Sequence, residues 1–190
     1  MAEKLNDKEK RFMLALARDA IKQYLEKNTK IDVKPSQVPS PRLTEDGACF
    51  VTLRIGKNLR GCIGSLEAHR PLVMDVVDNA ISSAFGDPRF SELTKKEFAK
   101  IRISISVLTK PVPFPVSGPD DLLKKLVAGK HGLILKQGWA RATFLPAVWE
   151  ELPDKAEFLS QLSLKAGLGP DGWKDPETEF EVYEAEEFSE

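Results

Sequence analysis

The residues best suited to chemistry lie in one hexapeptide, LRGCIG, at positions 59–64. Side chains of a strand alternate between two faces, so Arg60 and Cys62 are expected to share one face. A nearby guanidinium favours the thiolate, which is the nucleophilic form of cysteine. Gly61 and Gly64 add no side chains, which lets a ligand or another backbone come close. The alternative to a reactive thiol is that Cys62 is only a small residue in a tightly packed strand, since free cysteines are often buried.

A second candidate is the turn DPRF at positions 87–90. Its arginine, Arg89, is able to bind a carboxylate or a phosphate through two parallel hydrogen bonds. The alternative is a loop that only ends a helix, with Phe90 anchored in the core. The residue types alone do not choose between these two interpretations.

We expect this turn to share a cleft with Cys62. The helix that starts near Pro71 has roughly 15 residues and spans about 22 Å. If it packs back along the preceding hairpin, its end returns towards Arg60. Arg60 and Arg89 beside one thiol would form a site for an anion, because a carboxylate or phosphate relieves their repulsion. The competing outcome is that Arg89 only pairs with Asp87 or with a surface acid.

Histidine and metal chemistry receive less support. His131 can serve as a general base only if the fold brings it to Cys62. The possible metal ligands Cys49, Cys62, His69 and His131 have none of the spacings of a zinc knuckle. We therefore expect no metal site, and no motif in the chain predicts a cofactor.

The composition excludes several classes of protein. The 190 residues are 42% hydrophobic and 30% charged, with a net charge of −1, which argues against a protein that grips phosphate backbones. Two cysteines are too few for a disulfide framework or for the three-cysteine cluster of a radical iron–sulfur enzyme. The sequence shows no apolar run of membrane-spanning length and no signal peptide, so we expect a cytoplasmic protein.

Hydrophobic periodicity predicts an α+β fold with antiparallel-rich sheets and flanking helices, because hairpins and helices do not alternate regularly. Cys49 is expected in the core, on the opposite face from Cys62. We expect one domain over 1–190, split into a larger and a smaller lobe, with flexible ends at 1–9 and 188–190. The expected helices are 6–28, 71–85, 119–127 and 155–166, and the expected strands are 48–55, 59–63, 101–107, 133–135, 141–144 and 180–183.

Six segments together resemble the AMMECR-domain family, which in bacteria and archaea is protein A of the AmmeMemoRadiSam system. They are LRGCIGSL (59–66), NAISSAFGDPRFSEL (79–93), ISISVL (103–108), HGL (131–133), ATFLPAVW (142–149) and LKAGL (164–168). Ser65 stands where the family commonly has threonine. The resemblance implies an α+β protein with two lobes that works with a Memo-like protein and a radical SAM enzyme. It implies no established biochemical activity.

Two functions remain open at this point. The first is an enzyme in which Cys62 is nucleophile or acid/base, with Arg60 and His131 as further catalytic residues. The second is a non-catalytic module that binds a small anionic ligand or a partner protein at the same place. The residues expected to bind the ligand are Gly61, Gly64, Ser65, Asp87 and Arg89. Nucleic-acid binding is the weakest interpretation, given the net charge.

Overall fold

The computed structural model describes residues 4–190, and these form two compact units. The first unit holds the chain up to Leu108 together with Glu186–Glu190, and the second unit is Thr109–Ala185. Each unit has its own sheet and its own hydrophobic core. The units are described separately below.

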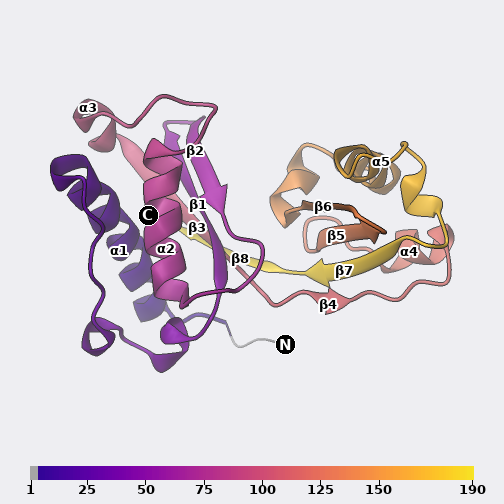
Figure 1. The fold of residues 1–190 in the computed structure, drawn as a ribbon, viewed down its shortest axis with the longest axis horizontal. Helices are drawn as coiled ribbons and strands as arrows, with labels where there is room; N and C mark the ends of the chain where they lie inside the picture. Colours follow the sequence, from indigo (N-terminus) through magenta and orange to yellow (C-terminus); the bar gives the residue numbers. More distant parts are fainter. Residues whose placement is uncertain (1–3) are drawn as a thin grey trace. The chain divides into compact units, whose positions relative to one another are not determined.

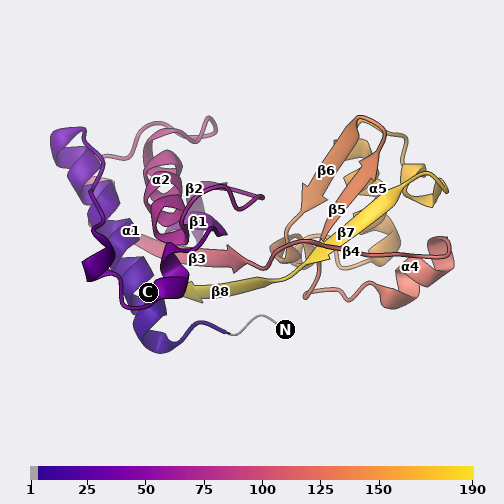
Figure 2. The same cartoon turned by 60° about the horizontal axis from the view of Figure 1, so that its bottom comes forward.

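The first unit is a four-stranded sheet with two helices on one face (Figures 1 and 2). The strand order is β2-β1-β3-β8, and β1 runs antiparallel to both β2 and β3. Helices α1 and α2 pack against each other and against the sheet. The elements are α1 (Asp7–Lys27), β1 (Ala48–Ile55), β2 (Asn58–Gly64), α2 (Leu72–Phe85), α3 (Lys95–Phe98), β3 (Ile101–Leu108) and β8 (Ala185–Ser189), with 3₁₀ turns at Pro35–Gln37 and Pro41–Thr44.

Local sequence explains where the first helix begins and ends. The Asn6 side chain accepts hydrogen bonds from the backbone N–H groups of Lys8 and Glu9, and the Glu9 carboxylate accepts one from the Asn6 N–H, which completes a capping box. Asn28 ends the helix in the left-handed conformation, with φ 54°. The apolar face between these caps buries Met13, Ala17, Ala20 and Ile21 completely.

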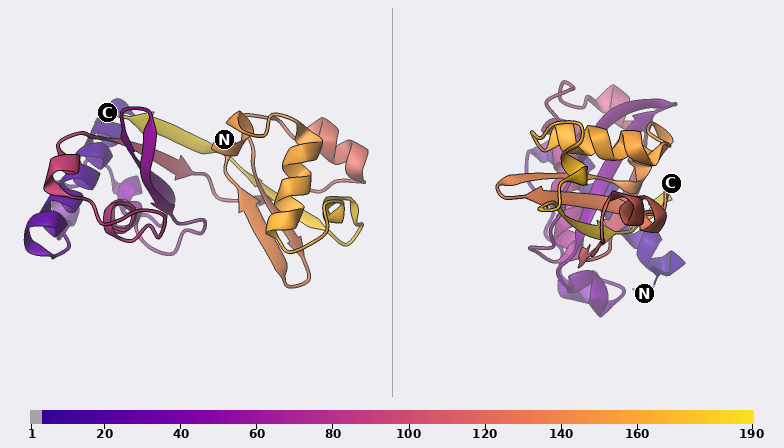
Figure 3. Two further views of the ribbon diagram at one scale, coloured as in Figure 1. Left: turned by 90° about the horizontal axis from the view of Figure 1, so that it is seen from above. Right: turned by 90° about the vertical axis from the view of Figure 1, so that its right-hand side faces the viewer.

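The second unit is an antiparallel sheet of order β4-β7-β5-β6, with α5 packed against β6 (Figure 3). Its core is aromatic. The Trp149 ring stacks on the Phe158 ring with 3.7 Å between the centroids, and the Phe144 ring meets the Phe158 ring edge-on. The elements are β4 (Val112–Pro113), α4 (Pro119–Lys125), β5 (Gly132–Gln137), β6 (Ala140–Phe144), α5 (Lys155–Lys165) and β7 (Glu179–Tyr183), with 3₁₀ turns at Pro146–Glu150 and Gly172–Lys174.

The α+β class expected from the sequence is confirmed, but the acidic C-terminal segment differs from the expectation. Strand β8 includes Phe188, and Glu190 accepts hydrogen bonds from Arg18 and from the Ile103 backbone. Lys10 forms an ion pair with Glu186. The acidic residues of this segment have no basic neighbours in the sequence, and residues 188–190 were expected to be flexible. The basic residues of α1, which lie far along the chain, supply their partners. At the other end, α1 already starts at Asp7, and residues 1–3 lie outside the described part.

The glycines of β2 permit an unusually close approach of neighbouring groups. A Cβ at Gly61 would lie 2.0 Å from the backbone oxygen of Ser83 in α2. A Cβ at Gly64 would lie 2.2 Å from the Phe50 ring and 2.6 Å from the Cys49 carbonyl oxygen. The sequence prediction that these glycines allow close backbone contact is confirmed, and the group that comes close is the protein's own.

Gly61→Ala should therefore lower the free energy of unfolding by about 3 kcal/mol, because the helix has to move away from the strand. Gly64→Ala should cost a comparable amount. Chemical denaturation measures both effects. Gly169→Ala is the matched control, since a Cβ at Gly169 meets no atom within 4 Å. Variants of Gly61 and Gly64 as stable as the control variant would contradict the argument from close packing.

Candidate functional site

Cys62 lies on the sheet face opposite the helices, and its side chain is half-buried. Its sulfur is 3.2 Å from the Thr52 hydroxyl, and Thr52 is the residue directly across from it on β1. Cys49, on the helix-covered face, is fully buried. Burial and the neighbouring Asp75 carboxylate raise the pKa of the Cys49 thiol well above its ordinary value. The predicted separation of the two thiols is confirmed.

The Asp87–Arg89 turn forms hydrogen bonds with the backbone of Cys62. The Cys62 N–H donates to Asp87 Oδ2 at 2.9 Å, and Arg89 Nη2 donates to the Cys62 carbonyl oxygen at 3.2 Å. Asp87 and Arg89 also pair with each other, through Nε at 2.9 Å and Nη2 at 2.7 Å. The turn therefore occupies the outer edge of β2, which is the edge strand of its sheet. The expected proximity of this turn to Cys62 is confirmed, although 25 residues separate Cys62 from Asp87.

Electrostatics hold this turn in one charge state. The Arg89 guanidinium keeps the pKa of the Asp87 carboxyl well below its usual range, and the backbone N–H groups of Cys62 and Arg89 act in the same direction. In return, Asp87 raises the pKa of Arg89. Asp87 is almost completely buried, whereas the Arg89 side chain is 54% exposed. The pair is neutral overall, and it holds the Arg89 guanidinium in a fixed position at the surface beside Cys62.

Arg60 does not support the thiol in the way the sequence suggested. The register of β1 and β2 shifts between Leu53 and Arg54, which leaves Arg60 as an extra residue in a bulge. Its guanidinium donates to Glu97 at 2.8 Å and to the Ser91 carbonyl oxygen at 2.8 Å. Strict alternation predicts a shared face only for an unbroken ladder. The arginine beside Cys62 is Arg89, and Arg60 instead anchors the chain around α3.

Glu97 is the counterpart of Arg60. Hydrogen bonds from the Arg60 guanidinium, and then from Thr94, lower the pKa of Glu97 to about 2. Thr94 and Glu97 also form a capping box at the start of α3. Both arginines of the expected anion site therefore already hold a carboxylate.

A polar stripe on α2 is the feature that sequence reasoning missed. Asp75, Asn79 and Ser83 are spaced by four residues in an otherwise apolar helix, and all three are buried against the sheet. Asp75 accepts the Cys49 N–H at 2.8 Å, and Asn79 donates to the Cys49 carbonyl oxygen at 3.1 Å. The signal was present, because buried polar groups at helical spacing need partners on the element they face.

The Ser83 hydroxyl bridges the backbones of β1 and β2. The Ile63 N–H donates to the Ser83 hydroxyl at 2.9 Å, and that hydroxyl donates to the Val51 carbonyl oxygen at 2.7 Å. Val51 and Ile63 lie opposite each other in the register. The hydroxyl thus links β1 to β2, which requires α2 to lie as close to the sheet as Gly61 allows.

Ser65 belongs to the same polar network. Its hydroxyl donates to Asp75 Oδ1 at 2.7 Å and accepts from Asn79 at 3.3 Å. Arg70 forms ion pairs with Asp75 and Asp78. These bonds fix the chain where it leaves β2, so the structure gives Ser65 a local anchoring role, as it gives Gly61 and Gly64 packing roles. A ligand-binding role for these three residues stays a prediction.

His131 lies in the second unit, just before β5. Its Nδ1 accepts the Val127 N–H at 3.2 Å, its ring meets Phe114 edge-on, and its carbonyl oxygen accepts from Trp149 at 2.7 Å. Burial lowers the pKa of His131, so its ring is neutral at pH 7. Each of these contacts is made within the second unit, and the predicted partnership with Cys62 stays a prediction.

The groups placed around Cys62 are hydroxyls and the Arg89 guanidinium. By register, Thr52 lies opposite Ser104 on β3, and Phe50 lies opposite Ser106. These half-buried side chains, with Cys62, form the outer face of the sheet, which we call the Cys62 face. Among residues 4–190, no group of three or more potential metal ligands comes together, and no described helix is long and apolar enough to cross a membrane.

The Asp87–Arg89 pair predicts an acid-sensitive contribution to stability. Because the pKa of Asp87 is lower in the folded state, its contribution is complete above about pH 4 and is lost as the pH falls further. Asp87→Asn should lower the free energy of unfolding by about 2–3 kcal/mol at pH 7, and the difference from wild type should shrink between pH 4 and pH 2. Urea denaturation across this range measures it, with Glu92→Gln as an exposed control. A difference that does not change with pH would refute the assignment.

Comparisons with known proteins agree with the fold and cover nearly the whole chain. The AMMECR1 family model matches residues 14–188. "Protein MK0488" of Methanopyrus kandleri is 45% identical over 194 residues, covering 100% of this chain and 92% of the relative. A relative from Methanothermobacter thermautotrophicus is 40% identical over 187 residues, covering 98% of this chain and 96% of the relative.

A solved structure shows the same architecture. The crystal structure of uncharacterized protein PH0010 from Pyrococcus horikoshii superposes with a TM-score of 0.88 at 35% identity, covering 98% of this chain and 93% of that chain. The family match, the relatives and the shared fold agree, and the chain therefore belongs to the AMMECR1 family.

Proposed function

We propose that the Cys62 face binds a small anionic molecule, with Arg89 as the contact for its charge. The observation that carries this proposal is that Arg89 spans Asp87 and the Cys62 carbonyl oxygen. Its Nε and Nη2 are used in these bonds, while Nη1 makes no hydrogen bond with any residue from 4 to 190. A guanidinium held rigidly with one free edge loses little entropy when it binds a carboxylate or phosphate.

The thiol and hydroxyls beside this cation supply the specificity. Cys62 and Thr52 are within hydrogen-bond distance of each other and lie on the same face as Ser104. They offer short, weakly polar donors and acceptors to the uncharged part of a ligand. Arg60 is committed to Glu97 and does not contribute to the site. The free edge of Arg89 matches one carboxylate or phosphate group of a ligand.

An enzyme that uses Cys62 as nucleophile is the second candidate. The favouring observation is that the thiol is partly exposed and that Arg89 donates to the carbonyl oxygen of the same residue. Within the first unit, its described hydrogen-bond partner is a hydroxyl and not a base. Catalysis would need a base from elsewhere, and His131 has the neutral ring that this role demands.

The partners implied by the family resemblance extend this proposal. We propose that the chain works with a Memo-like protein and a radical SAM enzyme, which supply or consume the anionic ligand. Co-purification of this chain with each tagged partner, with and without small-molecule extract, tests the association. The absence of any complex and of any effect on the partner enzyme's turnover would reject it.

Binding of an anion through Arg89 is tested by metabolite capture. Wild-type protein incubated with a metabolite extract should retain a carboxylate or phosphate that mass spectrometry detects. Arg89→Gln should lower its affinity about tenfold or more, and Arg89→Lys should have a smaller effect, because it keeps the charge and loses the forked geometry. Arg141→Gln is the control, as an exposed arginine in the second unit. Equal retention by all four proteins, with unchanged melting temperatures, would exclude Arg89 as the contact.

The two thiols provide a further test of the same site. Native protein treated with iodoacetamide should be alkylated at Cys62 faster than at Cys49, since Cys49 is buried and its pKa is raised. Trypsin separates the two cysteines into different peptides, so mass spectrometry measures both rates in one sample. If Cys62 is also a nucleophile, His131→Ala should shift the pH profile of its alkylation. Faster alkylation of Cys49 would contradict the face assignment.

A further inference from the structure

Arg54 and Arg102 are two like charges that face each other across neighbouring strands of the first sheet. They lie directly opposite in the register of β1 and β3. Each follows a buried residue, Leu53 or Ile101, whose side chain faces the helices. Because side chains alternate along a strand, both arginines point to the side of the sheet away from α1 and α2 (Figure 1). This is also the side of the Cys62 face.

Neither of these two guanidiniums has a hydrogen-bonded partner. Both side chains are exposed, and within residues 4–190 neither of them forms a hydrogen bond or an ion pair. Arg102 helps to lower the pKa of Glu190, but the Glu190 carboxylate is already bound by Arg18. Like charges directly opposite each other on a sheet destabilise it. An anion between the two guanidiniums would relieve their repulsion.

The sequence around this pair is basic. Residues 48–66, which include β1 and β2, and residues 100–108, which include β3, contain five Lys or Arg residues and no Asp or Glu. Two of the five are exposed lysines near the pair: Lys57 lies in the turn after β1, and Lys100 directly precedes β3. This end of the sheet is therefore locally positive in a chain whose net charge is −1, and it attracts an anion.

The pair lies close to Cys62 along the strands. Thr52, which is opposite Cys62, is two residues from Arg54, or about 7 Å along β1. Ser104, which is opposite Thr52, has the same spacing from Arg102 on β3. The two hydroxyls thus lie in the row between the guanidiniums and the thiol side of the face. A small elongated molecule is long enough to reach both ends.

We propose that the ligand of the Cys62 face carries a phosphate group that Arg54 and Arg102 bind, in addition to the anionic group that Arg89 contacts. This inference rests on the proposed function, since it concerns a second part of the same ligand. A phosphate suits the pair better than a carboxylate does, because its larger charge and three free oxygens serve two guanidiniums at once. The ligand class is an elongated small molecule with a phosphate at one end and a carboxylate or phosphate at the other.

Isothermal titration calorimetry with two synthetic probes tests the inference. Hexane bisphosphonate has a phosphonate group at each end, and hexylphosphonate has one on the same carbon chain. Wild-type protein should bind the bisphosphonate at least about tenfold more tightly, because the second group binds within the same molecule. Arg54→Gln/Arg102→Gln should remove this advantage, and Arg54→Lys/Arg102→Lys should keep part of it. The melting temperature of the Gln variant should not fall, because two like charges are removed.

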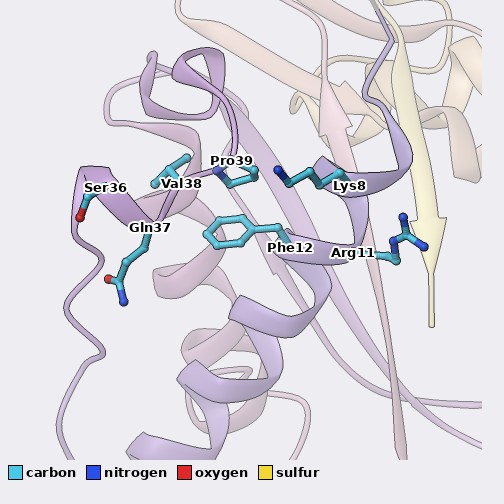
Figure 4. A pocket seen from close by; sticks show the side chains of 7 residues that line it. All are labelled: Lys8, Arg11, Phe12, Ser36, Gln37, Val38 and Pro39. Atoms are coloured by element: carbon cyan, nitrogen blue, oxygen red, sulfur yellow. The ribbon is translucent and has the colours of Figure 1, made fainter.

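Arg11→Gln/Lys22→Gln is the charge-matched control. Both residues are exposed on α1, which packs on the opposite side of the sheet. The Arg11 side chain points away from Phe12 and the neighbouring loop (Figure 4). This control should bind both probes as wild type does. An equal loss of bisphosphonate affinity in the two double Gln variants would overturn the pair as a site, because only the overall charge would then matter.

The remaining outcomes separate this inference from the proposed function. If hexane bisphosphonate binds no more tightly than hexylphosphonate, while Arg89→Gln still weakens the binding of both, the second group is refuted and the proposed function stands. If Arg89→Gln changes the binding of neither probe, the proposed function fails and the shared ligand fails with it. A thymidine oligonucleotide that binds more tightly than the bisphosphonate, and only when Arg54 and Arg102 are present, would overturn the assignment to a small molecule.

Discussion

The distance between α2 and the sheet is the constraint on which the first unit depends. The helix lies so close that a single methyl group at Gly61 would meet the backbone oxygen of Ser83 at 2.0 Å. This closeness allows the Ser83 hydroxyl to link Ile63 to Val51. Because an unpaired polar group in a dry core is costly, the helix cannot withdraw without losing these bonds. Close packing and polar pairing therefore enforce each other.

The geometry around Cys62 follows from that closeness. The end of α2 lies beside the outer edge of β2, and the turn that follows it delivers Asp87 and Arg89 to the Cys62 backbone. Asp87 satisfies an N–H that an edge strand would otherwise leave open, and Arg89 neutralises the buried carboxylate. The same contacts that close the sheet edge thus fix a cation next to a half-buried thiol. A structural requirement and a candidate binding site share one set of residues.

The charge at the Cys62 face is held in place by one ion pair. Arg89 is held by Asp87, so its affinity for an anion depends on the geometry of its free edge.

Local patterns determined most of the secondary structure and the class of the fold. Caps at Asn6 and Thr94 and the alternation in β1 and β3 are readable because each depends on neighbours along the chain. Alternation along the hexapeptide correctly predicted that Cys62 lies outside the core, and the glycines of the hexapeptide correctly indicated close packing. Strand β8 was missed because its acids find their basic partners on α1, which lies far away in the sequence.

Only the tertiary structure decided which groups meet. A one-residue bulge turned Arg60 towards Glu97, and no propensity in the sequence announces a bulge at that position. The closeness of α2 to β2 placed Arg89 at the thiol instead. The sequence by itself determined the residue types and the faces of regular elements, because these follow from local periodicity. The pairing of charges depends on contacts between elements. An arginine side chain is long enough to reach carboxylates on several elements, and the packing of those elements decides which carboxylate it meets.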